Sequence, residues 1–135
     1  FKLVEDIERL GDHAEDLSWT VAHLAPYSQG VEIPSLLQEA KVAMSMVKDS
    51  YRGFAQGDDS LALEVIQRDD VVDNLYLKAL EEIPEFRDRY SLHDDFILYA
   101  TLMAKYWERV ADHASNIAEW VDYIETGCYK GDEIL

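Results

Sequence analysis

The sequence predicts an all-α protein, an antiparallel up-and-down bundle of helices. Apolar residues recur every three or four positions, and no useful stretch shows the alternation of a β-strand. The few helix-breaking residues, three prolines and six glycines, fall where helices would be expected to end. With 135 residues, 48% of them hydrophobic, the chain is long enough for one domain with a real core.

Turn and capping residues predict where each helix begins and ends. Pro34 suits the first turn of a helix, and Ser91 followed by Asp94 resembles a capping box. Gly127 suits the residue after a helix end. We therefore expect four long helices with short, antiparallel connections, at residues 1–24, 34–55, about 60–86 and 91–125.

The charge and the single cysteine narrow the class of protein. The chain has 28 acidic and 12 basic residues, a formal charge of −16, which argues against nucleic-acid and membrane-surface binding. Its longest apolar stretch, residues 96–104, is less than half of the roughly 20 residues that span a bilayer. Cys128 has no partner for an intrachain disulfide, as is common in the cytoplasm. We expect a cytoplasmic protein with no direct membrane insertion.

A repeat divides the chain. The segment 8–14 (ERLGDHA) returns 100 residues later as 108–114 (ERVADHA), and the apolar positions around the two copies align as well. Such a repeat indicates a duplicated structural unit. We expect residues 1–27 to be the last helix of a truncated first unit, 31–128 to form a complete three-helix domain, and 129–135 to be a C-terminal tail.

Three carboxylate pairs are candidate metal ligands, because residues four apart lie on one face of a helix. They are Glu8 with Asp12, Asp69 with Asp73, and Glu108 with Asp112. Carboxylates suit hard cations such as magnesium, calcium, manganese or iron. A solvated acidic face is the simpler alternative for any single pair. If the pairs at 69/73 and 108/112 meet between helices, however, their repulsion demands protons or cations.

Enzymatic motifs are absent. The sequence has no nucleotide-binding phosphate loop and no recognisable nucleophile with its base, so we expect no catalytic residues and no organic cofactor. A carboxylate-bridged dinuclear metalloenzyme remains as an alternative. Its ferritin-like form requires Glu-x-x-His, whereas Glu108 and His113 are five residues apart. We expect His13 and His113 to pack between helices rather than to bind metal.

Two stretches carry a resemblance to a known family. Residues 57–76 (GDDSLALEVIQRDDVVDNLY) and 108–127 (ERVADHASNIAEWVDYIETG) resemble the PhoU family of phosphate-signalling proteins, and the weaker copy at 8–17 extends the likeness. The resemblance implies two three-helix bundles, each with acid-x-x-x-Asp motifs that hold a multinuclear iron or zinc cluster. Manganese and magnesium are further candidates. One complete set of ligands would be Asp69, Asp73, Glu108 and Asp112, and Glu8 and Asp12 would be half of a second.

The same resemblance implies a regulatory role without enzymatic turnover. Members of the family restrain the phosphate-starvation response and link the ATPase of a phosphate ABC transporter to a sensor histidine kinase. A rigid acidic surface suits docking to basic partners. Because the apolar stripe of residues 3–24 would lack its own bundle, we also expect that helix to dock on the complete domain or to form a homo-oligomer.

Overall fold

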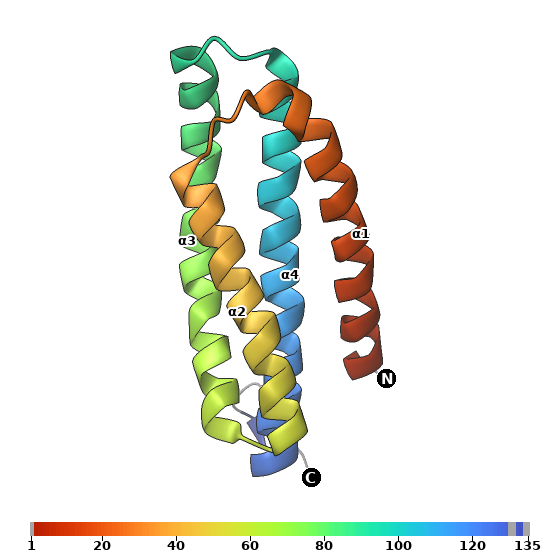
Figure 1. Ribbon diagram of the computed structural model, residues 1–135. Coiled ribbons are helices and arrows are strands. Elements are labelled where there is room, and N and C mark those ends of the chain that lie inside the picture. The colour runs from red at the N-terminus through yellow and green to blue at the C-terminus, as the bar shows by residue number, and fades with distance from the viewer. Residues whose placement is uncertain (1, 130–131, 134–135) are drawn as a thin grey trace.

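The computed structural model describes residues 2–129 and 132–133. The described chain consists of four long helices and one short strand pair (Figure 1): α1 (Lys2–Ser28), α2 (Pro34–Gln56), α3 (Asp59–Arg89), α4 (Asp94–Thr126), β1 (Cys128–Tyr129) and β2 (Asp132–Glu133). The predicted all-α up-and-down bundle is therefore confirmed. The antiparallel strands begin at Cys128, the last residue of the predicted domain, and continue into the predicted C-terminal tail, which lies partly outside the described residues.

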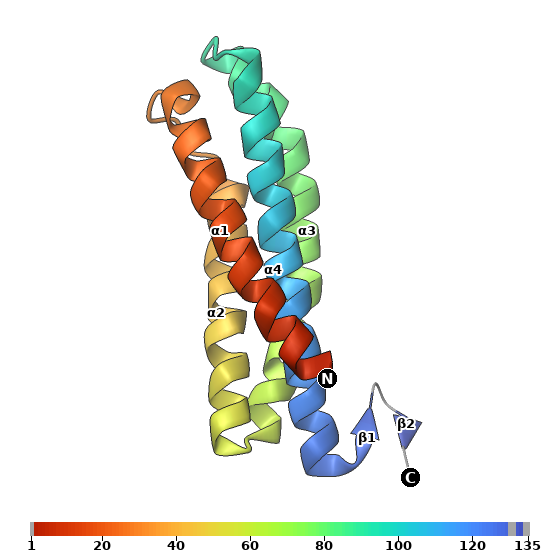
Figure 2. The same cartoon turned by 90° about the vertical axis from the view of Figure 1, so that its right-hand side faces the viewer.

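Helix α4 is the centre of the arrangement. Helices α2, α3 and α4 form a three-helix bundle, and α1 lies along the outside of α4 (Figures 1 and 2). Within the described residues, the backbone of α1 approaches that of α4 alone. Consequently α4 is covered on three sides, and some of its polar residues, among them Asp112 and His113, lie against neighbouring helices.

The helix ends follow the predicted signals with three exceptions. Pro26 lies inside the last turn of α1, and α3 continues through Pro84 to Arg89. The predicted capping box at Ser91 is wrong: Ser91 has a positive φ of 51° and belongs to the turn that ends α3. His93 caps α4 instead, because its Nδ1 accepts a hydrogen bond of 3.0 Å from the backbone N–H of Asp95.

The core consists of two clusters stacked along the bundle. One is built around Met46, Val65 and Val72, and it includes Leu17 of α1. The other is built around Ile83 and Phe96, near the opposite end of the helices. Small residues on α4, among them Ala100, Ala104, Ala111, Ala114 and Ala118, are fully buried. They allow three helices to approach α4 closely, which brings side chains between α3 and α4 into contact.

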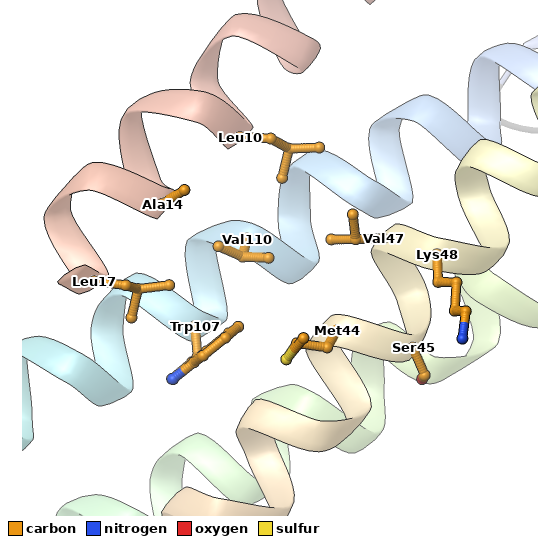
Figure 3. A pocket seen from close by; sticks show the side chains of 9 residues that line it. All are labelled: Leu10, Ala14, Leu17, Met44, Ser45, Val47, Lys48, Trp107 and Val110. Atoms are coloured by element: carbon orange, nitrogen blue, oxygen red, sulfur yellow. The ribbon is translucent and has the colours of Figure 1, made fainter. Parts of the chain in front are cut away.

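An apolar groove lies beside this core. It has a volume of about 670 Å³ and opens between α1 and α2, with α4 as its floor (Figure 3). Its lining is apolar except for two residues of α2: Leu10, Ala14, Leu17, Met44, Ser45, Val47, Lys48, Trp107 and Val110. The groove therefore contains no group of acids, bases or metal ligands. In addition, no described helix is both long and apolar enough to cross a membrane.

Candidate metal centre

Three aspartates from two helices converge between α3 and α4. Asp69 and Asp73 are one helical turn apart on α3, and Asp112 faces them from α4. One carboxylate oxygen from each lies within 4.8 Å of the other two. The sequence predicted this meeting only on the condition that the two helices pack side by side, and the structure satisfies that condition.

Glu108, the fourth predicted ligand, lies one turn before Asp112 on α4. Its side chain is 15% exposed, and a hydrogen bond joins it to Asp112. The ammonium group of Lys105 lies 3.1 Å from Glu108 Oε2, and its positive charge partly opposes the rise in the pKa of Asp73 described below. The candidate metal centre, defined as Asp69, Asp73, Glu108 and Asp112, thus has four carboxyl groups beside one lysine.

Burial and mutual repulsion change the acidity of this group. Burial is the main cause that raises the pKa of Asp69 to about 6, and the charge of Asp73 is the next. Burial and then the charge of Glu108 raise the pKa of Asp112 to about 7. The pKa of Asp73 is raised as well, by burial and by Glu108. The carboxyl groups therefore hold protons more tightly than isolated ones, and a cation would relieve the same repulsion.

A fifth carboxyl group comes from α2, and the sequence analysis missed it. Glu39 is completely buried, and neither of its oxygens has a hydrogen-bond partner among the described residues. Burial raises the pKa of Glu39 to about 9, and the negative charge of Glu108 adds to the shift. Because Glu39 feels the charge of Glu108, it extends the acidic cluster from the α3–α4 interface toward α2.

These residues have the chemistry of a site for hard cations. Every donor is a carboxylate oxygen, the ligand preferred by magnesium, manganese and iron and also accepted by zinc. Asp69 Oδ1 is buried without a hydrogen-bond partner in the described part of the chain, as are both oxygens of Glu39. Buried oxygens without partners are costly in a native protein, and a bound cation would satisfy them.

The third predicted pair does not join any such group. Glu8 and Asp12 are exposed on α1, and no described cluster of three ligating side chains includes either of them. The half site expected at Glu8 and Asp12 stays a prediction. The pair is therefore a natural internal control for the pairs on α3 and α4, since it has the same spacing.

The two histidines of the repeat lie between α1 and α4, outside the candidate metal centre. His113 Nδ1 lies 2.9 Å from Asp6 Oδ1, and the rings of His13 and His113 stack with centroids 5.3 Å apart. Both histidines thus pack between helices, as the sequence predicted. Neither belongs to the described carboxylate group.

Comparison with known proteins agrees with this architecture. The PhoU domain model matches residues 36–121. Three proteins named phosphate-specific transport system accessory protein PhoU homologue each match 93% of the chain. The protein of Clostridium acetobutylicum is 30% identical and is covered over 58% of its length, and that of Synechocystis is 35% identical and is covered over 56%. Homologue 1 of Thermotoga maritima is 32% identical and is covered over 55%. The chain thus spans little more than half the length of these relatives. From the extent of the domain match, the chain belongs to the PhoU family.

Proposed function

We propose that this chain is a non-enzymatic, metal-binding regulator of phosphate uptake and phosphate-starvation signalling. The names of its relatives, accessory proteins of phosphate-specific transport, support the phosphate part of the proposal. One observation carries the metal part, the convergence of Asp69, Asp73 and Asp112 within 4.8 Å. Together they favour a bundle that is held in one shape by a metal cluster.

Asp69, Asp73, Glu108 and Asp112 would hold the metal, and Glu39 would add a fifth acidic group beside Glu108. Like charges this close are stable only when protons or cations neutralise them. Iron or zinc is the metal class that the family resemblance implies, with manganese and magnesium as alternatives of matching ligand chemistry. Bound metal would supply positive charge that ties α3 to α4.

Partner proteins follow from the family and from the charge of the surface. We propose that the protein acts in the cytoplasm as an adaptor between the ATPase of a phosphate ABC transporter and a sensor histidine kinase. A net charge of −16 favours basic docking surfaces, and it predicts faster association at low ionic strength. Exposed apolar residues on α1, among them Ile7, Trp19 and Val21, favour a homo-oligomer. Sedimentation of the purified protein would test that state.

Elemental analysis of purified protein tests the metal site. We expect wild-type protein to retain iron, zinc or manganese and the variant Asp69→Asn/Asp112→Asn to lose it. The matched control is Glu8→Gln/Asp12→Asn, which alters two exposed acids at the same spacing on α1 and should keep the metal. Equal metal content in all three proteins would contradict the proposed ligands.

Thermal unfolding gives an independent measure of the same site. A cation at 100 times its dissociation constant stabilises the native state by about 2.7 kcal/mol. We expect the metal to raise the Tm of wild-type protein and a chelator to reverse the increase. The Asp69→Asn/Asp112→Asn variant should instead have a higher Tm than metal-free wild type, because it lacks two repelling carboxylates, and should not respond to metal.

A dinuclear metalloenzyme is the weaker alternative. Among the described residues, no histidine nitrogen lies with the carboxylate group, and His113 Nδ1 is engaged by Asp6. Oxygen consumption by the iron-loaded protein would discriminate the two functions. Turnover that disappears in Asp69→Asn/Asp112→Asn would support the enzyme.

A further inference from the structure

A polar cavity lies between the N-terminal half of α1 and the middle of α4. It has a volume of about 370 Å³, and it differs from the carboxylate centre in its excess of basic groups. Arg9, His13, Arg109 and His113 line it, together with Lys2 and the acids Glu5 and Asp6. Four of these seven residues are the arginines and histidines of the two ERxxDH copies.

The repeat explains why basic side chains collect here. Helix α1 runs antiparallel to α4, and the two copies lie against each other so that the rings of His13 and His113 stack at an interplanar angle of 26°. Each copy places its arginine four residues before its histidine, on the same face of its helix. Arg9 and Arg109 therefore approach one cavity from opposite helices.

The two arginines also differ from the others in the chain. Of its six arginines, Arg52, Arg68, Arg87 and Arg89 each lie within ion-pair distance of a carboxylate. Arg9 and Arg109 have no such partner in the part of the chain that the structure describes. In a protein with 28 acidic residues, two arginines that share a cavity and lack carboxylate partners indicate a site for an external anion.

Buried Asp6 restricts which anion fits. It is 2% exposed, and its Oδ1 accepts hydrogen bonds from His113 Nδ1 at 2.9 Å and Asn116 Nδ2 at 3.3 Å. Its Oδ2 is buried and has no partner among the described residues. An anion that still carries a proton could donate to this oxygen, whereas an anion without a proton would be repelled by it.

A cation is a poor alternative occupant. The four acidic or histidine groups at the cavity are Glu5, Asp6, His13 and His113. Within the part of the chain that the structure describes, no three of them bring ligand atoms close enough together to hold a metal. Lys2, Arg9 and Arg109 place three positively charged side chains in the lining, against the two acids Glu5 and Asp6. This balance of charge favours an incoming anion.

We propose that this cavity binds a protonated phosphate group, with Arg9 and Arg109 as the charged donors and Asp6 as the acceptor of the phosphate proton. At neutral pH, orthophosphate has both acceptor oxygens and a hydroxyl, whereas sulfate has no proton to donate to Asp6. The inference deepens the proposed function, since it gives a regulator of phosphate uptake a place to bind phosphate. It does not depend on the metal centre, which lies between other helix faces.

Isothermal titration calorimetry at neutral pH tests the site, with inorganic phosphate, phosphoserine and sulfate as separate ligands. We expect saturable phosphate binding that weakens about tenfold or more in Arg9→Gln/Arg109→Gln, as charge-assisted hydrogen bonds are lost. Arg52→Gln, an exposed arginine of α2, should bind as wild type does. A phosphomonoester has a second pKa of about 6 and has mostly lost its proton at neutral pH, so phosphoserine should bind more weakly than free phosphate. Stronger binding of phosphoserine than of free phosphate would contradict the role given to Asp6.

Two comparisons make the outcome decisive. Sulfate should bind about tenfold or more weakly than phosphate to wild type, and Asp6→Asn should reduce this preference, because an amide can donate to either anion. Asp69→Asn/Asp112→Asn should bind phosphate normally. Binding lost in that variant would place phosphate on the metal and overturn the proposal, as would equal affinity for sulfate or no saturation with millimolar phosphate. Retained metal in Arg9→Gln/Arg109→Gln would show that the metal proposal stands regardless.

Discussion

His13 of α1 and His113 of α4 occupy the same position in the two copies of the repeat, and their rings stack with centroids 5.3 Å apart. This contact defines the register in which α1 lies on the three-helix bundle. Next to it, buried Asp6 accepts hydrogen bonds from His113 and Asn116 of α4. A polar cluster therefore fixes the position of a helix that is otherwise attached along one side only.

The first prediction concerns this attachment. Asp6→Ala removes the acceptor for His113 and Asn116, and we expect a loss of about 1–3 kcal/mol in the free energy of unfolding, because two partly buried donors lose their partner. Asp12→Ala, an exposed acid on the same helix, should change it by less than about 0.5 kcal/mol. Urea denaturation of both variants measures the difference. Equal stabilities would mean that apolar packing alone holds α1.

The second prediction concerns Glu39 and the pH dependence of the metal-free protein. The pKa of Glu39 is raised to about 9 from a usual 4.5, so between these values the native state binds more protons than the unfolded state. The stabilising effect of the proton is complete below about pH 4.5 and is lost as the pH rises through about 9. Chelator-treated protein should therefore lose stability with rising pH.

Single substitutions distinguish the contribution of Glu39 to the pH dependence of stability from that of the aspartates. The pKa of Asp69 is raised to about 6 and that of Asp112 to about 7. These two groups therefore also reduce stability as the pH rises, but at lower pH than Glu39 does. Glu39→Gln should flatten the decrease above about pH 7, whereas Glu64→Gln, an exposed acid, should not. A slope unchanged by Glu39→Gln would show that Glu39 is not protonated in the native state. Measurement of Tm across the pH range provides the test.

The third prediction concerns a carboxyl pair at the end of the bundle near the start of α3. A hydrogen bond with Asp59 is the main cause that raises the pKa of Asp122 to about 6, followed by burial and the charge of Asp59. The proton shared by Asp122 and Asp59 therefore stabilises the native state at acid pH, and this stabilisation is lost as the pH rises through about 6. Asp122→Asn keeps a donor for Asp59 at every pH.

We therefore expect Asp122→Asn to exceed wild type in stability by about 1 kcal/mol above neutral pH and to match it in acid. Glu81→Gln, an exposed acid on α3, serves as the control and should follow wild type throughout. Chemical denaturation at acid and at alkaline pH gives the two differences. A constant offset between Asp122→Asn and wild type would mean that no proton is shared with Asp59.

The sequence predicted the helices well because Pro34, Gly57 and Gly127 act locally. The sequence failed to predict the start of α4, because Ser91 adopts a left-handed backbone in the turn after α3 and does not cap α4. Pro84 was expected to lie near a helix end, but a single lost backbone hydrogen bond does not stop a helix whose neighbour Ile83 is fully buried.

The candidate metal centre was predictable in part. Acid pairs four residues apart are visible in the sequence, so Asp69, Asp73, Glu108 and Asp112 were found. Glu39 has no acidic partner at that spacing and was missed. The sequence did contain a signal for Glu39. The buried positions of α2 recur mostly at intervals of three and four, and Glu39 is the one charged residue among them. The other buried residues of α2 are Ser35, Leu36, Ala43, Met46, Ser50 and Gly53. A lone acid in an apolar stripe indicates a buried carboxyl group.

The last prediction contrasts two glycines. Gly57 ends α2 with a φ of 63°, a conformation that side chains disfavour, and a Cβ there would lie 2.9 Å from Glu125 Oε1. Gly57→Ala should therefore destabilise the protein by about 1 kcal/mol or more. Gly11 lies inside α1 with nothing within 4 Å of an added Cβ, so Gly11→Ala should stabilise by about 0.5–1 kcal/mol through helix propensity. Opposite shifts in the urea midpoint would verify both conformations, whereas two shifts of the same sign would show that α1 unfolds separately or that the α2–α3 turn rearranges.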